Sequence, residues 1–152
     1  MTELIQWRLM FRVSNRRAFD KCLARTLPLF GSGIKLGECK PYWKIPELWE
    51  CNLVSPVSPG STAEQVLACL LLCQSLASGW YIHCPRSAES ADCFSGVFDK
   101  RLGGASSPLG WLEWASFRFV TGGMAEPGAA PHGGPATPVD NSAVTEGPAS
   151  VS

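Results

Sequence analysis

Apolar and polar residues alternate along the first segment of the chain. Between Glu3 and Val13, every second residue is apolar and most of the residues between them are polar. This period of two is typical of a strand with one face against a core and the other toward solvent. The pattern predicts a strand whose buried side chains are Ile5, Trp7, Leu9, Phe11 and Val13.

A helix is predicted directly after this strand. Ser14 or Asn15 can cap its N-terminus, and Pro28 cannot continue it because proline has no backbone N–H. Apolar residues at spacings of three and four predict its inner face, and one basic residue per turn predicts a solvated outer face. The inner face comprises Phe19, Cys22, Leu23 and Leu27, and the outer face Arg17, Lys21 and Arg25.

Two further strands are predicted over residues 34–43 and 48–54, joined as a hairpin. Gly37 and Pro41 interrupt the first of them, which favours a position at the edge of a sheet. The second alternates clearly, with Trp49, Cys51 and Leu53 on one face.

A capping box, Ser61-Thr62-Ala63-Glu64, predicts the start of a second helix, because its hydroxyl and carboxylate can each accept a hydrogen bond from a backbone N–H of the first turn. Its body, residues 63–77, is apolar on most of its circumference. We therefore expect it to pack across the sheet and also against another surface. Gly79 is placed where a C-terminal cap belongs.

Three more strands are predicted, over residues 80–84, 94–98 and 111–120. In the last, strict alternation places Trp111, Ala115, Phe117 and Phe119 on one face and Leu112, Trp114, Ser116 and Arg118 on the other. Trp114 on this second face indicates that the face is covered or is offered to a partner.

The order β-α-β-β-α-β with extra C-terminal strands predicts an α+β fold, a ferredoxin-like βαββαβ sandwich. Right-handed crossovers would place both helices on one side of the sheet. Other topologies share the same order. We expect a single domain over residues 1–121, whereas residues 122–152, rich in Pro and Gly and without aromatic residues, predict a disordered tail.

Composition predicts a protein of the cytoplasm. The seven cysteines are odd in number and scattered, which favours free thiols over a disulfide framework. The N-terminus does not resemble a signal peptide. The most apolar stretch, Val66 to Cys73, is too short to cross a membrane. Charge is zero overall but uneven, with nine Lys and Arg against three acids in residues 1–44, and four against seven in residues 45–121.

No motif for catalysis, a cofactor or a metal accompanies these elements. His83 and Cys84 are adjacent in a predicted strand, so their side chains point to opposite faces. Cys69 and Cys73 lie in the middle of an apolar helix, where thiols usually serve packing. We expect no enzyme, no cofactor and no metal. An aromatic RNA-binding motif would need a glycine that the segment 7–11 lacks, so nucleic acid is not the expected partner.

Acidic residues interleaved with aromatic ones remain as the candidate binding surface. Aromatic anchors surrounded by carboxylates suit a protein that masks the basic active site of a nuclease. The alternative is an ordinary solvated surface with tryptophans in the core. The predicted partner-binding residues are Glu47, Trp49, Glu50, Asp92, Asp99 and Glu113.

The body of the chain, residues 3–120, resembles the immunity proteins of bacterial polymorphic-toxin and contact-dependent inhibition systems. The segments that carry the resemblance are Trp7 to Val13, Leu48 to Cys51, Ser61 to Gln65, Gly79 to Ile82 and Phe94 to Phe98. The resemblance implies stoichiometric neutralisation of a cognate toxin, often a nuclease, by masking its active site.

Two alternatives to neutralisation remain open. The first is a ferredoxin-like ligand- or RNA-binding regulator that uses Arg17, Lys21 and Arg25. The second is a small enzyme that uses His83. The sequence leaves the oligomeric state open.

Overall fold

The computed structural model describes residues 4–84 and 94–120, which form an α+β fold with six strands and two α-helices. The predicted tail, residues 122–152, lies outside this range. The elements are β1 (Leu4–Arg12), α1 (Arg16–Thr26), the short 3-10 helix η1 (Leu27–Phe30), β2 (Lys35–Pro41), β3 (Leu48–Pro56), α2 (Thr62–Leu76), β4 (Tyr81–His83), β5 (Ser95–Asp99) and β6 (Leu112–Val120).

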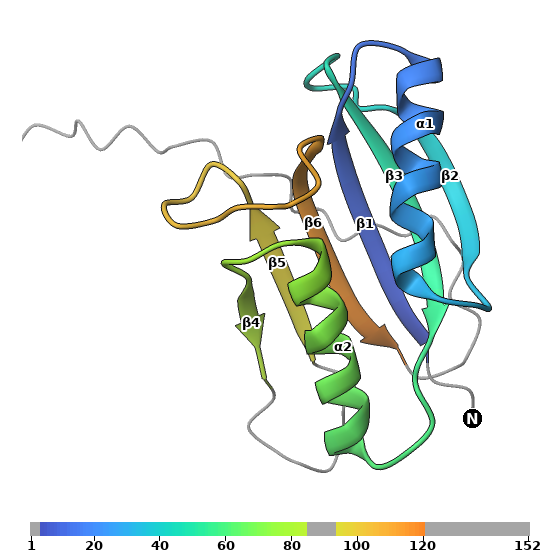
Figure 1. The fold of residues 1–152 in the computed structure, drawn as a ribbon, viewed down its shortest axis with the longest axis vertical. Helices are drawn as coiled ribbons and strands as arrows, with labels where there is room; N and C mark the ends of the chain where they lie inside the picture. Colours follow the sequence, from blue (N-terminus) through green and yellow to red (C-terminus); the bar gives the residue numbers. More distant parts are fainter. Residues whose placement is uncertain (1–3, 85–93, 121–152) are drawn as a thin grey trace, which may run out of the picture.

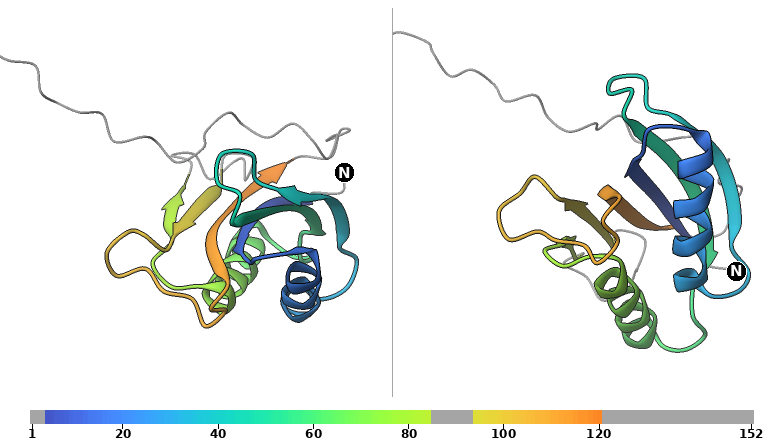
Figure 2. Two further views of the ribbon diagram at one scale, coloured as in Figure 1. Left: turned by 90° about the horizontal axis from the view of Figure 1, so that it is seen from above. Right: turned by 45° about the horizontal axis from the view of Figure 1, so that its top comes forward.

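All strand pairs are antiparallel, and the strands form one sheet in the order β2-β3-β1-β6-β5-β4 (Figure 1). Both helices lie on the same side of this sheet, as predicted (Figure 2). We call this side the helix face and the other side the open face. Among the described residues, no helix covers the open face.

β1 lies near the middle of the sheet, between β3 and β6. Its predicted alternation is confirmed, because Ile5, Trp7, Leu9 and Phe11 are all buried on the helix face. Met10 is also buried, although it points to the open face. The open face is therefore covered near the C-terminal end of β1.

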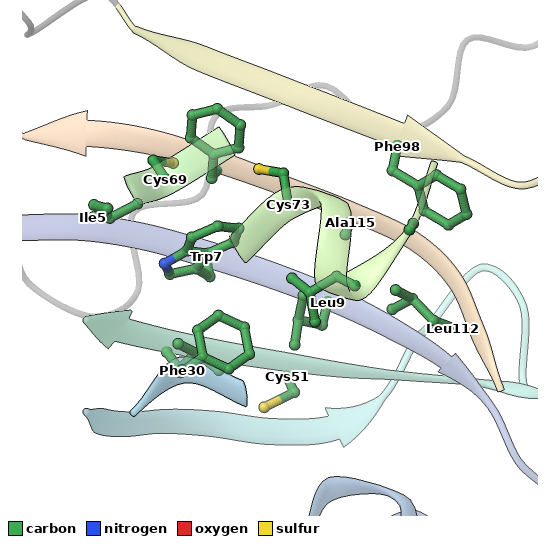
Figure 3. Close-up of a cluster of buried hydrophobic side chains, with 14 of the residues drawn as sticks. Ile5, Trp7, Leu9, Phe30, Cys51, Cys69, Cys73, Phe98, Leu112 and Ala115 are labelled. Carbon is green, nitrogen blue, oxygen red and sulfur yellow. The ribbon is translucent and has the colours of Figure 1, made fainter. Parts of the chain in front are cut away.

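Trp7 lies at the centre of the core on the helix face (Figure 3). Its ring meets Phe30 edge-on at a centroid distance of 5.1 Å and lies 5.3 Å from the ring of Phe117. The indole Nε1 donates a hydrogen bond to Ser55 Oγ at 2.9 Å, so the one polar atom of the side chain is satisfied. Trp7 thus joins β1, β3, β6 and η1 in a single cluster.

Both predicted helix starts are confirmed. The side chain of Asn15 accepts a hydrogen bond from the backbone N–H of Ala18, and Ser61 and Glu64 form the reciprocal capping box. α1 ends at Thr26, and Pro28 lies in the first turn of η1, where its missing N–H costs nothing.

The apolar circumference of α2 is only partly buried. Cys69, Cys73 and Leu76 face the core, whereas Leu67 and Leu71 are each 56% exposed. The packing against the sheet is confirmed. No described element covers the exposed leucines, so the predicted second surface is not supplied by residues 4–84 or 94–120.

The prediction for the two faces of β6 was wrong at Leu112. The ladder between β1 and β6 pairs Met10 with Trp114 but Phe11 with Leu112, so Glu113 is an extra residue at a bulge. The bulge turns Leu112 into the core of the helix face, where it is fully buried (Figure 3), while Trp114 stays on the open face. Strict alternation cannot anticipate such an inserted residue.

The chain returns to the centre of the sheet through its last three strands. β4, the strand that follows α2, lies at the far edge, and β5 and β6 then run inward until β6 pairs with β1. In a four-stranded ferredoxin-like sheet, the strand after the second helix would itself lie beside β1. What the structure establishes is an α+β fold with a six-stranded antiparallel sheet and two helices on one face.

Candidate functional site

A small pocket lies on the open face where β1, β3, β5 and β6 approach the turn between β2 and β3. Its volume is about 40 Å³, which is room for a small group rather than for a cofactor. We call it the open-face pocket. It is lined by Met10, Arg12, Tyr42, Ile45, Leu48, Asp99, Arg101, Glu113 and Trp114.

The floor of the open-face pocket is apolar because the turn after β2 folds over the sheet. Three backbone hydrogen bonds hold this turn: Tyr42 N–H to Leu48 O at 2.7 Å, Leu48 N–H to Ile45 O at 2.9 Å, and Ile45 N–H to Tyr42 O at 3.2 Å. They place Tyr42, Ile45 and Leu48 against Met10 and Trp114 in a second hydrophobic cluster. This cluster explains the burial of Met10.

A buried ion pair lies beside this cluster. Arg8 Nε donates to Glu50 Oε1 at 2.8 Å, and the Nδ2 of Asn52 lies 3.4 Å from the same oxygen. The Arg8 guanidinium is 5.9 Å from the ring centroid of Tyr42 and 5.8 Å from that of Trp114. A cation near two aromatic rings is stabilised by their quadrupoles, so Arg8 orders the residues that form the floor of the pocket.

A second ion pair joins Asp99 to Arg101. The guanidinium binds both carboxylate oxygens, at 2.9 Å and 2.6 Å, and the Arg101 backbone N–H donates to Oδ1 at 3.0 Å. The hydrogen bonds from the Arg101 side chain hold the pKa of Asp99 below its usual value, more than burial raises it. Asp99 is therefore a structural anion at neutral pH.

Glu113, the residue at the bulge, is the second carboxylate that lines the open-face pocket. Its Oε1 lies 3.3 Å from Arg12 Nε and 3.3 Å from Lys100 Nζ. The Lys100 Nζ also donates to the Gly110 carbonyl at 3.1 Å, which ties the loop before β6 to the end of β5.

In each of these pairs the basic side chain is the more exposed member. The exposed fraction is 53% for Arg12 and 36% for Lys100 but 15% for Glu113, and it is 60% for Arg101 but 11% for Asp99. The carboxylates lie beneath the cations. We call Arg12 and Arg101, which line the pocket, together with Lys100, which pairs with Glu113 beside it, the basic rim.

Two of the six predicted partner-binding residues, Asp99 and Glu113, line the pocket, and a third, Glu50, lies beside its floor as the partner of Arg8. Glu47 is exposed in the turn before β3. Trp49 points to the helix face, where it stacks on Phe19 at a centroid distance of 5.1 Å. Asp92 lies outside the described residues. The more exposed charges around the pocket are the cations Arg12, Lys100 and Arg101, and the carboxylates that pair with them are more buried.

Sequence reasoning did not identify the residues of the basic rim as parts of the candidate site. One signal was present for Arg12, which falls on the polar side of the first alternating strand. For Lys100 and Arg101 there was none, because they follow β5 in an irregular loop and reach the site only through pairing of β5 with β6.

None of the other reactive groups named in the sequence analysis, His83, Cys84, Cys69 and Cys73, lines the open-face pocket. His83 is exposed on the edge strand β4, and Cys84 is exposed directly after it. The hydrogen bond with Cys69 and burial both raise the pKa of the Cys73 thiol, which keeps it protonated. Within residues 4–84 and 94–120, no three His, Cys, Asp or Glu side chains are grouped so that they could hold a metal ion.

Comparison of the chain with protein-family models, with curated proteins and with solved structures gives no match. None of the helices in the described ranges has the length and apolar character needed to cross a membrane.

Proposed function

We propose that the protein is a binding protein without catalytic activity, and that its partner is a protein that docks on the open face of the sheet. The observation that carries this proposal is the open-face pocket, with an apolar floor and a rim of exposed cations. In its most specific form, the proposal is an immunity protein that acts in the cytoplasm and neutralises a cognate bacterial toxin.

The composition of the pocket supports binding rather than catalysis. Aromatic residues and arginines around an apolar centre are the groups that contribute most to protein interfaces. The two carboxylates that line the pocket, Asp99 and Glu113, are each held by basic side chains. Asp99, whose pKa is lowered and whose guanidinium partner is fixed, is a poor general acid or base near neutral pH.

The charge of the surface indicates which partner would fit. The whole chain is neutral, with thirteen Lys and Arg against thirteen Asp and Glu, but the exposed charges at the pocket are those of the basic rim. Electrostatic complementarity therefore favours an acidic surface on the partner. A toxin bound in this way would be blocked because the domain covers its active site, with the contact made to acidic residues beside that site.

The same proposal includes a fold assignment. The order β2-β3-β1-β6 matches the strand order of a ferredoxin-like sheet if β6 takes the place of the strand that follows the second helix. β4 and β5 would then be an insertion before this last strand. Such an insertion also explains the origin of the site, because β5 delivers Asp99 and the loop that follows it delivers Lys100 and Arg101.

Co-expression with a toxin encoded by the neighbouring gene tests the immunity proposal. We expect the protein to restore growth of cells that produce the toxin, and to elute with it as a one-to-one complex from a sizing column. Inhibition by binding and enzymatic inactivation of the toxin would both restore growth. The ratio of the two chains in the complex separates these mechanisms, because inhibition by binding gives a stable one-to-one complex. Absence of both rescue and complex would end the proposal.

A second candidate function is RNA binding through α1, and one observation favours it. Arg17, Lys21 and Arg25 are exposed along this helix, as predicted. The open face itself is less suited to RNA, because the Arg8 guanidinium already lies near the rings of Tyr42 and Trp114, on which a base would have to stack. A salt-dependent mobility shift with single-stranded RNA, lost on charge reversal of the three α1 residues, would favour this function.

A further inference from the structure

We propose that Cys39 and Cys51 are a modification site, at which a small-molecule disulfide such as oxidised glutathione converts the two thiols into a disulfide between β2 and β3. This inference is independent of the proposed partner. It concerns the pair of strands that carries the turn over the open-face pocket.

The register of the sheet places the two cysteines side by side. Cys39 is the direct partner of Cys51 in the antiparallel ladder of β2 and β3, and both side chains point to the helix face. Their Sγ atoms are 3.3 Å apart, against about 2.05 Å in a disulfide. Directly opposite residues have Cβ atoms about 4.5–5.5 Å apart, and a disulfide needs about 3.5–4.5 Å. The two Cβ atoms must therefore approach by about 1 Å.

β2 can supply this small movement. Among the six described strands it pairs with β3 alone, and its ladder is irregular between Leu36 and Cys39. Each central strand, in contrast, is held by two neighbours. Cys51, on β3, can therefore stay fixed in the core while Cys39 moves toward it.

Burial decides the order of the chemical steps. Cys51 is fully buried, whereas Cys39 is only partly buried and is the thiol that a reagent reaches first. Burial raises the pKa of both thiols. Because the thiolate is the nucleophile, the reaction at neutral pH is slow and accelerates as the pH rises.

Oxidised glutathione is the only oxidant that this thiol–disulfide exchange needs. The Cys39 thiolate attacks one sulfur of oxidised glutathione, forming a mixed disulfide and releasing one glutathione thiolate. Cys51 then gives up its proton and attacks the Cys39 sulfur, and the second glutathione leaves. Two protein thiols are oxidised by two electrons, and one glutathione disulfide is reduced to two thiols.

The chain contains an internal control in Cys69 and Cys73. These two thiols also lie close together, one turn apart on α2, but both are 2% exposed on the face of the helix that packs on the sheet, with no partly exposed member that a reagent could attack first. Cys84 is exposed but is a single thiol in the described structure and serves as a control for simple glutathione addition.

The experiment treats the full chain with oxidised glutathione at pH 8, quenches with acid, unfolds and alkylates the remaining thiols, digests with trypsin and chymotrypsin so that Cys51 is separated from Cys69 and Cys73, and maps the peptides by tandem mass spectrometry. We expect a peptide pair linked through Cys39 and Cys51, with a loss of about 2 Da for the two hydrogens. We expect Cys69 and Cys73 to be alkylated, and dithiothreitol to remove the link.

Variants separate the proposed pair from adventitious oxidation. Cys39→Ser should abolish the link and leave Cys51 reduced, Cys51→Ser should trap glutathione on Cys39, and Cys84→Ser should leave the link unchanged. The inference is overturned if native Cys39 ends as a stable glutathione adduct, if it stays reduced while Cys84 reacts, or if the Cys69 and Cys73 pair is oxidised first.

Discussion

Replacement of Trp7 by alanine is expected to lower the free energy of unfolding by about 4 kcal/mol, the largest effect of any single truncation proposed here. Trp7 is 2% exposed and contacts rings from η1 and β6. Its removal leaves a cavity at the centre of the sheet. It also leaves the Ser55 hydroxyl without the hydrogen bond that it accepts from the indole in the native protein. Neighbouring aromatic rings are themselves packed against one another, so the cavity cannot close easily. Urea unfolding followed by circular dichroism measures the loss.

Trp43→Ala is the matched control for this prediction. Trp43 is 78% exposed in the turn after β2, so the same substitution should change the free energy of unfolding by less than about 0.5 kcal/mol. Equal effects of the two substitutions would contradict the central position of Trp7 in the core.

Truncation of Glu50 is expected to cost about 3 kcal/mol of stability. Glu50 is 5% exposed, and its carboxylate is the ionic partner of Arg8, whose side chain is 16% exposed. Glu50→Ala leaves the Arg8 guanidinium largely buried without a counter-ion. The desolvation of that charge is then uncompensated, and the rings of Tyr42 and Trp114 offset only a part of it.

Two further variants test the reason for this loss. The double replacement of Arg8 and Glu50 by methionine removes both charges together and should recover most of the stability, because no charge is left buried. Glu38→Ala removes a carboxylate that pairs with Lys40 at the surface, where both side chains are about half exposed, and should cost less than about 1 kcal/mol. A loss as large in the double variant as in Glu50→Ala would assign the effect to packing instead of charge.

The sequence predicted the local elements well, because their signals lie within a few residues of one another. The alternation of β1 and the caps at Asn15 and Ser61 each depend on side chains three or fewer residues apart, and each is confirmed. The interruption of the second strand by Pro41 correctly indicated an edge.

Features that depend on distant partners could not be predicted in the same way. The bulge at Glu113 arises from pairing with β1, about one hundred residues earlier in the chain, and it reverses the face of Leu112. The acidic residues Asp99 and Glu113 were identified by type, but alternation along one strand does not show which basic side chains cover them. Trp49 was predicted at the surface because its neighbours are acidic, yet its own place in the alternation directs it to the core.

The position of the binding surface is tested most directly by two double charge reversals with the same change in charge. Arg12→Glu/Arg101→Glu alters the basic rim of the open-face pocket, and Arg17→Glu/Lys21→Glu alters the exposed side of α1. The measurement is the dissociation constant of each folded variant for the cognate toxin, with thermal unfolding as the check of folding. Arg12→Gln/Arg101→Gln replaces the first variant if Asp99 cannot tolerate a neighbouring carboxylate. Our account predicts at least a tenfold weaker complex for the rim variant and an unchanged one for the α1 variant. An unchanged dissociation constant for the rim variant, with binding lost in the α1 variant, would contradict it.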